Sequence, residues 1–215
     1  MAGTPRVLIV DDHPLVREGM SLAIRSAFPH LAVDNAETIA AAIALVDRHQ
    51  GYQLVLLDLM MPDANGFSGF LELQHRLDET PIAMISAKQD ANTVRIARAL
   101  GAAGYLPKTQ PLDDLVRSIN QILAGKPVFP TLDAPIDEAA QAAHERLASL
   151  STAQLRVLLA LASGRLNKQV AGDLGVTEAT IKAHLTAIFR KLGVYNRTQA
   201  ILAVQPLLAH RPEAA

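Results

Sequence analysis

Four short apolar segments end in residues that can do chemistry, and this repeated arrangement limits the fold more than any other feature. Short apolar runs bounded by turn residues are typical of strands buried on both faces, as in parallel sheets. The segments are 7–10 before Asp11 and Asp12, 54–57 before Asp58, 81–85 before Ser86, and 104–107 before Lys108. The sequence therefore predicts an α/β domain around a parallel sheet.

Helical patterns alternate with these strands. Residues 112–123 carry apolar side chains at 112, 115, 116, 119, 122 and 123, a one-sided stripe that predicts an amphipathic helix packed on the sheet. Residues 38–46 open with Thr38, a good N-cap. With one further strand at 31–33, the predicted helices cover 14–27, 38–46, 67–77, 92–100 and 112–123. Strands alternating with helices predict a doubly wound, five-stranded parallel sheet.

Polar residues from four strand ends should meet at one edge of this sheet, because parallel strands end together. Taken alone, Asp58 is explained as a turn residue, and Asp11 and Asp12 as caps of the following helix. Together, neighbouring carboxylates repel, so the site must raise a pKa or bind a hard metal ion. Because Lys108 is available to meet a phosphoryl oxygen, we expect Mg²⁺ together with phosphate.

The order Asp-Asp, Asp-x-x-Met-Pro, Ser-Ala and Lys, with this spacing, resembles the receiver domain of two-component response regulators from residue 6 to about 124. The resemblance implies a flavodoxin-like fold and Asp58 as acceptor of a phosphoryl group. It also implies that Ser86 and Lys108 contact that group. The implied Mg²⁺ ligands are Asp12, Asp58, the backbone carbonyl of Met60, and Asp11 through a bound water.

Tyr105 lies inside the strand that ends before Lys108. An aromatic residue at such a position is more often a core residue than a switch. In receivers the matching aromatic side chain turns inward when the serine hydroxyl moves to the phosphoryl group. The resemblance therefore implies that Tyr105 is a switch residue.

A proline-rich stretch divides the chain. Residues 125–135 contain three prolines and no helical period, which predicts a linker, and residues 137–149 predict a connecting helix. Charge changes here as well: residues 1–124 have ten Lys and Arg against fourteen Asp and Glu, whereas residues 150–215 have eight against three. We expect a receiver at 1–124, a linker at 125–146, a second domain at 147–209 and a tail at 210–215.

The second domain has the pattern of a small, all-α helix-turn-helix domain. A helix from Leu150 stops near Gly164, a second covers 167–174, and a third runs from the Thr177 cap to Leu192. A fourth helix covers 197–208. One side of the third helix is apolar, with Ile181, Leu185, Ile188 and Leu192, and its other side is small or basic. A basic face of this kind favours nucleic acid as the partner.

The motifs Asn-Lys-Gln-Val-Ala, Leu-Gly-Val-Thr and Lys-Leu-Gly-Val-Tyr-Asn-Arg-Thr-Gln-Ala resemble the LuxR-type DNA-binding domain over about residues 147–209. Both domains together resemble the NarL/FixJ class of response regulators. The resemblance implies base contacts from Lys182, Ala183 and Thr186. Further DNA contacts are expected from Lys168, Thr180, Arg190, Lys191 and Arg197, although each basic residue could equally be a solvated surface charge. His184 has no second His or Cys at metal-binding spacing, which favours a surface or packing role over a metal ligand.

Two functions remain open from the sequence. The first is a transcription factor that a sensor histidine kinase phosphorylates on Asp58 and that binds promoter DNA as a homodimer, with RNA polymerase as a further partner that promoter binding allows. The second is a phosphate sink or a phosphorylation-independent docking regulator with accessory DNA binding. Residues after 125 do not combine a nucleophile, a base or metal ligands at useful spacing, so we expect no enzyme. Without cysteines or an apolar run of about 18 residues, the sequence predicts a cytoplasmic protein without a membrane span.

Overall fold

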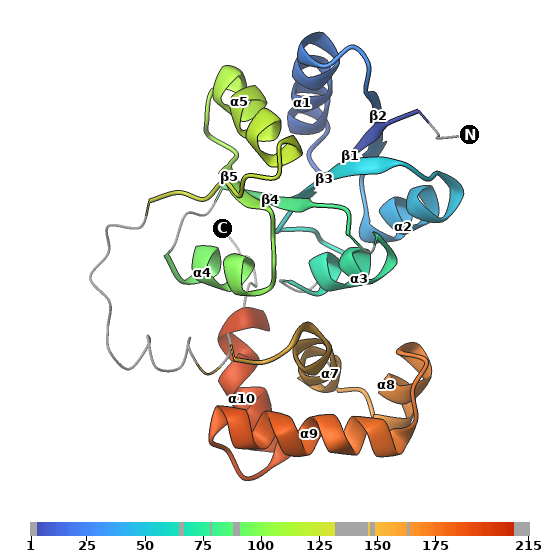
Figure 1. The fold of residues 1–215 in the computed structure, drawn as a ribbon, viewed down its shortest axis with the longest axis vertical. Coiled ribbons are helices and arrows are strands. Elements are labelled where there is room, and N and C mark those ends of the chain that lie inside the picture. The colour runs from blue at the N-terminus through green and yellow to red at the C-terminus, as the bar shows by residue number, and fades with distance from the viewer. Residues whose placement is uncertain are drawn as a thin grey trace. The chain divides into compact units, whose positions relative to one another are not determined.

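A five-stranded parallel sheet in the order β2-β1-β3-β4-β5 forms the centre of the first part of the chain (Figure 1). Its strands are β1 Arg6–Val10, β2 Ala32–Ala36, β3 Tyr52–Asp58, β4 Ile82–Ser86 and β5 Gly104–Pro107. The strand order reverses between β1 and β3, the point at which open α/β sheets place their ligands. The predicted doubly wound sheet is confirmed.

Helices cover both faces of this sheet: α1 and α5 lie on one face and α2, α3 and α4 on the other (Figure 1). The apolar stripe expected on α5 is buried through Leu115, Ile119 and Ile122. These side chains join a core that includes Ile9 of β1 and Leu56 of β3. The helices are α1 Pro14–Ala27, α2 Ile39–Arg48, α3 Ser68–Leu77, α4 Ala91–Ala99 and α5 Leu112–Leu123.

Two side chains cap the start of α2. The Thr38 hydroxyl accepts a hydrogen bond from the N–H of Ala41 at 3.0 Å, as its position in the sequence predicts. The second cap comes from the loop after β3, where the Asp63 carboxylate accepts from the N–H of Ile39 at 2.8 Å. The loop that follows Asp58 is therefore fixed to a neighbouring helix.

The chain continues along the sheet after α5. Val128 forms a parallel bridge with Gly104 of β5, in the stretch where the sequence predicts only a linker. The N–H of Val128 donates to the carbonyl of Ala103 at 3.1 Å, and its carbonyl accepts from the N–H of Tyr105 at 2.8 Å. Composition alone does not predict this pairing, because it depends on where the edge of the sheet lies.

The last part of the chain is helical, with α7 Thr152–Ala162, α8 Asn167–Asp173, α9 Glu178–Leu192 and α10 Arg197–Leu208. Ser151 caps α7: its hydroxyl accepts from the N–H of Gln154 at 3.3 Å, and the Gln154 side chain accepts from the N–H of Ser151 at 3.0 Å. This reciprocal pair is a capping box, and it fixes the start of the helix. The expected small all-α domain is confirmed.

The computed structural model describes residues 4–64, 67–77, 79–87, 91–131, 146, 149–162 and 164–208. The chain divides into two compact units, of which the first reaches Leu132 and the second runs from Asp133 to His210. The connecting helix expected at 137–149 falls mostly outside the described residues. None of the helices in the described ranges combines the length and the apolar composition needed to cross a bilayer.

Candidate functional site

Asp58 ends β3 as a buried carboxylate, with 2% of the residue exposed. Its Oδ1 accepts a hydrogen bond from the N–H of Met60 at 3.0 Å, which orients the group at the edge of the sheet. The next residue, Leu59, donates its N–H to the carbonyl of Ile85 on β4 at 3.1 Å. Strand pairing on either side thus fixes the position of Asp58.

Lys108 connects the two most buried acids. Its Nζ lies 2.7 Å from Oδ2 of Asp58 and 2.8 Å from Oδ2 of Asp11, and its side chain is only 12% exposed. The backbone N–H of Lys108 donates to the carbonyl of Ser86 at 2.9 Å, so β4 holds the start of the loop that carries the ammonium group. The expected convergence of Asp11, Asp58 and Lys108 at one edge of the sheet is observed.

Burial and charge act in opposite directions on this cluster. Burial raises the pKa of Asp58 above its usual value, and Asp11 adds to the rise, whereas Lys108 and the N–H of Met60 limit it. Burial alone would lower the pKa of Lys108, but its hydrogen bonds to Asp11 and Asp58 and their negative charges raise it instead. Lys108 therefore stays cationic, and its charge is what keeps two adjacent carboxylates compatible.

Four side chains could hold a metal ion. Ligand atoms of Asp11, Asp12, His13 and Asp58 all lie within 4.8 Å of one another. Three carboxylates in so small a space suit a hard cation such as Mg²⁺, which prefers oxygen ligands. The sequence did not predict His13 as part of this group. Its ring Nδ1 lies 2.7 Å from Oδ1 of Asp12, and its backbone N–H donates to Oδ1 of Asp11 at 2.8 Å. Its position directly after the acid pair is the signal that could have identified it.

Ser86 lies on β4, the strand that pairs with β3, and Tyr105 lies on β5, the next strand beyond it. Both residues are fully buried, Ser86 at the end of β4 and Tyr105 inside β5. Tyr105 pairs with Met84 of β4, and its N–H reaches Val128 on the other side. The inward position of Tyr105 agrees with both a core role and the switch role that the resemblance implies.

In the second unit, α9 has one buried and one exposed side. Its buried residues are Ile181, Ile188 and Leu192, with Leu185 half-buried. The Thr177 side chain accepts from the N–H of Thr180 at 3.1 Å and starts the helix, as predicted. Thr180 itself is half-buried, and its hydroxyl lies 2.9 Å from that of Thr177. The expected base contacts and one phosphate contact are exposed on this helix: Lys182, Ala183, Thr186 and Arg190.

Among the other basic residues expected to contact DNA, two have partners inside the unit. Lys191 donates from Nζ to the carbonyl of Ser149 at 2.6 Å and to Oε1 of Gln154 at 2.9 Å. Arg197 donates to the carbonyls of Leu161 and Arg165 at 3.1 and 2.7 Å. The sequence does not reveal these hydrogen bonds, because the acceptors are distant along the chain from Lys191 and Arg197. Lys168 is exposed on α8.

The sequence matches two families that correspond to the two units. Residues 7–120 match the response regulator receiver domain, and residues 148–204 match the bacterial regulatory proteins of the luxR family. Together the two matches are those of a response regulator transcription factor and not of an enzyme, as the sequence predicts.

Relatives match over nearly the whole chain. The glycerol metabolism activator of Pseudomonas putida is 38% identical over 207 residues, covering 92% of this chain and 94% of that protein. The nitrate/nitrite response regulator protein NarL of Escherichia coli K12 is 30% identical, covering 92% and 94%. The solved structure of RcsB from Salmonella enterica serovar Typhimurium, bound to the promoter rprA with the phosphomimetic BeF3⁻, has a TM-score of 0.51. It covers 94% of this chain and 98% of that one, but at 21% identity it supports the fold alone. The chain therefore belongs to the response regulators that combine a receiver domain with a LuxR-type DNA-binding domain.

Proposed function

We propose that Asp58 accepts a phosphoryl group from a sensor histidine kinase, and that this modification controls promoter binding by the second unit. The observation that carries the proposal is the position of Lys108, whose Nζ lies within 2.8 Å of the carboxylates of both Asp11 and Asp58. Once a phosphoryl group is attached to Asp58, this ammonium group can bind one of its oxygens. A phosphorylation-independent docking role would not require this buried charge cluster.

The chemistry assigned to Asp58 is nucleophilic. An Oδ of Asp58 attacks phosphorus in line, the bond from phosphorus to the donor breaks, and the donor leaves with that electron pair. Lys108 neutralises charge on the transferred group, and the Ser86 hydroxyl donates a hydrogen bond to it. Mg²⁺ would be held by Asp12, Asp58, the Met60 carbonyl and, through water, Asp11, and it would screen the phosphoryl charge from the carboxylates.

For DNA we propose that the exposed side of α9 enters the major groove. Lys182 is the main base contact, while Ala183 and Thr186 are small enough for the helix to approach and offer methyl groups to thymine. Thr180 lies beside them. Arg190 and Lys168, both exposed, bind backbone phosphates. Lys191 and Arg197 can contribute charge there, but their internal hydrogen bonds also give them a structural role.

The active form is proposed to be a homodimer, because a dimer of helix-turn-helix units matches two half-sites on DNA. Promoter binding also brings RNA polymerase within reach as a partner. The kinase, the promoter and the dimer contacts are separate questions from the chemistry at Asp58, which can be tested by itself.

The test is labelling by a small phosphodonor in the presence of Mg²⁺. We expect one phosphoryl group per chain, and we expect none on Asp58→Ala or after addition of EDTA. Intact mass and the DNA affinity of the same samples are both measured. Equal labelling of Asp58→Ala, or labelling that EDTA does not affect, would reject the assignment of the site.

A further inference from the structure

Residues 126–130, here called the docked segment, are bound to the edge of the receiver's sheet. Val128 shares two backbone hydrogen bonds with the β5 region, one to the carbonyl of Ala103 and one from the N–H of Tyr105. Its side chain packs against the buried core of the first unit. The docked segment is therefore part of the sheet and not a free tether.

A second contact holds the docked segment to α4. The guanidinium carbon of Arg98 lies 4.6 Å from the centre of the Phe129 ring, within the range of a cation–π interaction. Arg98 is exposed, so the contribution of this contact to stability is small. Its importance lies in joining α4 and β5 through the same short segment.

Gly104 allows the docked segment to come close. A Cβ added at Gly104 would lie 2.9 Å from the carbonyl oxygen of Val128, closer than side-chain carbons normally approach. It would also lie 2.9 Å from Cδ1 of Ile122. Glycine within a strand often marks such a close backbone approach. The pairing therefore depends on the residue type at position 104.

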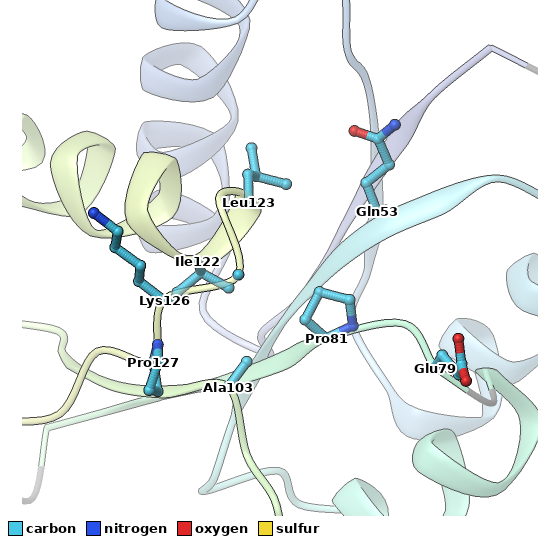
Figure 2. A pocket seen from close by; sticks show the side chains of 9 residues that line it. Gln53, Glu79, Pro81, Ala103, Ile122, Leu123, Lys126 and Pro127 are labelled. Carbon is cyan, nitrogen blue, oxygen red and sulfur yellow. The ribbon is translucent and has the colours of Figure 1, made fainter.

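The docked segment also borders an open space. A cavity of about 550 Å³ lies at the starts of β3, β4 and β5, at the end of the sheet away from Asp58, and Lys126 and Pro127 line it together with Pro81 and Ala103 (Figure 2). Tight packing would fix the segment from all sides. Hydrogen bonds fix the segment along β5, and the N–H of Lys126 donates to the carbonyl of Gln121 at 2.9 Å, so the free space lies beside residues whose backbone is already held.

We propose that the docked segment carries the state of the phosphoacceptor site to the chain beyond residue 131, an inference that rests on the proposed phosphorylation of Asp58. The link is β5, which spans only four residues. Lys108 follows its last residue and lies 2.7 Å from Asp58, while the N–H of Tyr105 near its start holds Val128. A phosphoryl group that draws Lys108 toward itself pulls on a strand too short to absorb the change, and the pairing with Val128 tightens.

The test measures amide hydrogen exchange in the full-length protein by NMR, with and without acetyl phosphate and Mg²⁺. We expect exchange at the N–H of Val128 to slow at least about fivefold on phosphorylation, the lower end of typical coupling between sites. The N–H of Ala32, which donates to Pro5 at the opposite edge of the sheet, is the internal control and should not change. An unchanged or faster rate at Val128 in protein shown by mass to be phosphorylated overturns the inference. Absence of label on Asp58 would instead reject the proposed function.

A matched pair of variants on α4 tests the output. Arg98→Ala removes the cation on Phe129, so we expect faster exchange at Val128 and a smaller change in DNA affinity on phosphorylation, with normal labelling of Asp58. Arg95→Ala removes the same charge from the same helix and should behave like the wild type. If Arg98→Ala and Arg95→Ala respond to phosphorylation equally, the docked segment does not carry the signal.

Discussion

At the scale of single residues, the receiver site is a balance between two buried carboxylates and one buried ammonium group. Asp58 and Asp11 are nearly inaccessible to water, and Lys108 lies within 2.8 Å of both. Removing one partner from a buried charge group usually costs more than the group contributes as a whole, because the remaining charge is left uncompensated. Asp58 is different, since its removal leaves Lys108 paired with Asp11.

This balance predicts a pH-dependent effect of Asp58→Asn on stability. Burial raises the pKa of Asp58 above 3.8, so the folded protein holds that proton more tightly than the unfolded chain does. The associated stability is fully present below pH 3.8 and is lost as the pH rises through the folded pKa. Asparagine does not ionise, so the variant should gain stability relative to the wild type as the pH rises above about 4, by at most about 1.4 kcal/mol per pH unit.

The measurement is urea unfolding in EDTA at several pH values from about 4 upward, because the effect of a raised carboxyl pKa begins there. Asp113→Asn, at an exposed position on α5, controls for the loss of one negative charge. If the advantage of Asp58→Asn instead shrinks as the pH rises, the charged carboxylate stabilises the fold, and the balance described here is reversed.

Residue types and the strand pattern were enough to predict that Asp11, Asp12, Asp58, Ser86 and Lys108 lie at or directly after the ends of strands. The basic residues of the second unit show the limit of this reasoning. Lys191 and Arg197 carry the same positive charge as Arg190, but both donate hydrogen bonds to carbonyl or amide oxygens far along the chain. Sequence predicts charge, but only the packing of helices tells whether that charge is already engaged.

At the scale of elements, local sequence signals predicted where several helices begin and end. Helices α1 and α5 begin and end where the sequence predicts, and α2 and α9 start next to their threonine caps. Such caps act within a few residues, so they can be recognised without the fold. Val128 has no local signal, since its partners belong to β5, and the proline-rich composition around it suggests only a linker.

The contact between β5 and the docked segment predicts a specific cost for Gly104→Ala. The new methyl group would press on a backbone oxygen, so we expect a loss of about 1–3 kcal/mol in the free energy of unfolding. Gly19→Ala is the control: nothing lies within 4 Å of a Cβ at this position of α1, and alanine should add up to about 1 kcal/mol as the better helix former. Denaturant unfolding measures both. A neutral effect of Gly104→Ala would mean that Val128 can move away at little cost.

Variants of two exposed residues on α9 can distinguish a contact to a base from a contact to a backbone phosphate. Lys182→Ala should cost about 1–3 kcal/mol on the specific site and relax the preference at one base pair. Arg190→Ala should weaken specific and scrambled duplexes alike and lower the salt slope by about 1. Arg190 is a better comparison than Lys191, whose removal would also break its bonds to Ser149 and Gln154. The measurement is the affinity of both variants for the specific and the scrambled duplex over a salt series. If Lys182→Ala loses affinity equally on both duplexes, Lys182 is a phosphate contact.

At the scale of the whole molecule, the second unit contains its own core, with Leu158, Val170 and Ile188 almost completely buried. We therefore expect a fragment that starts near residue 140 to fold and to bind DNA without phosphorylation. If the unphosphorylated receiver inhibits binding, the fragment should bind more tightly than the full-length protein, by a factor of about 5–150. Titration of one duplex with both proteins measures the factor. Tighter binding by the unphosphorylated full-length chain would argue against inhibition.

The pairing of Val128 with Gly104 also affects how the protein behaves toward other copies of itself. β5 is an edge strand, and an edge with free N–H and C=O groups can recruit a strand from another molecule. Because Val128 already occupies the backbone groups of Ala103 and Tyr105, that route to aggregation is closed along part of the edge. A receiver cut directly after α5 would lose this cover, so the structural boundary of the first unit lies beyond Val128 and not at the end of its last helix.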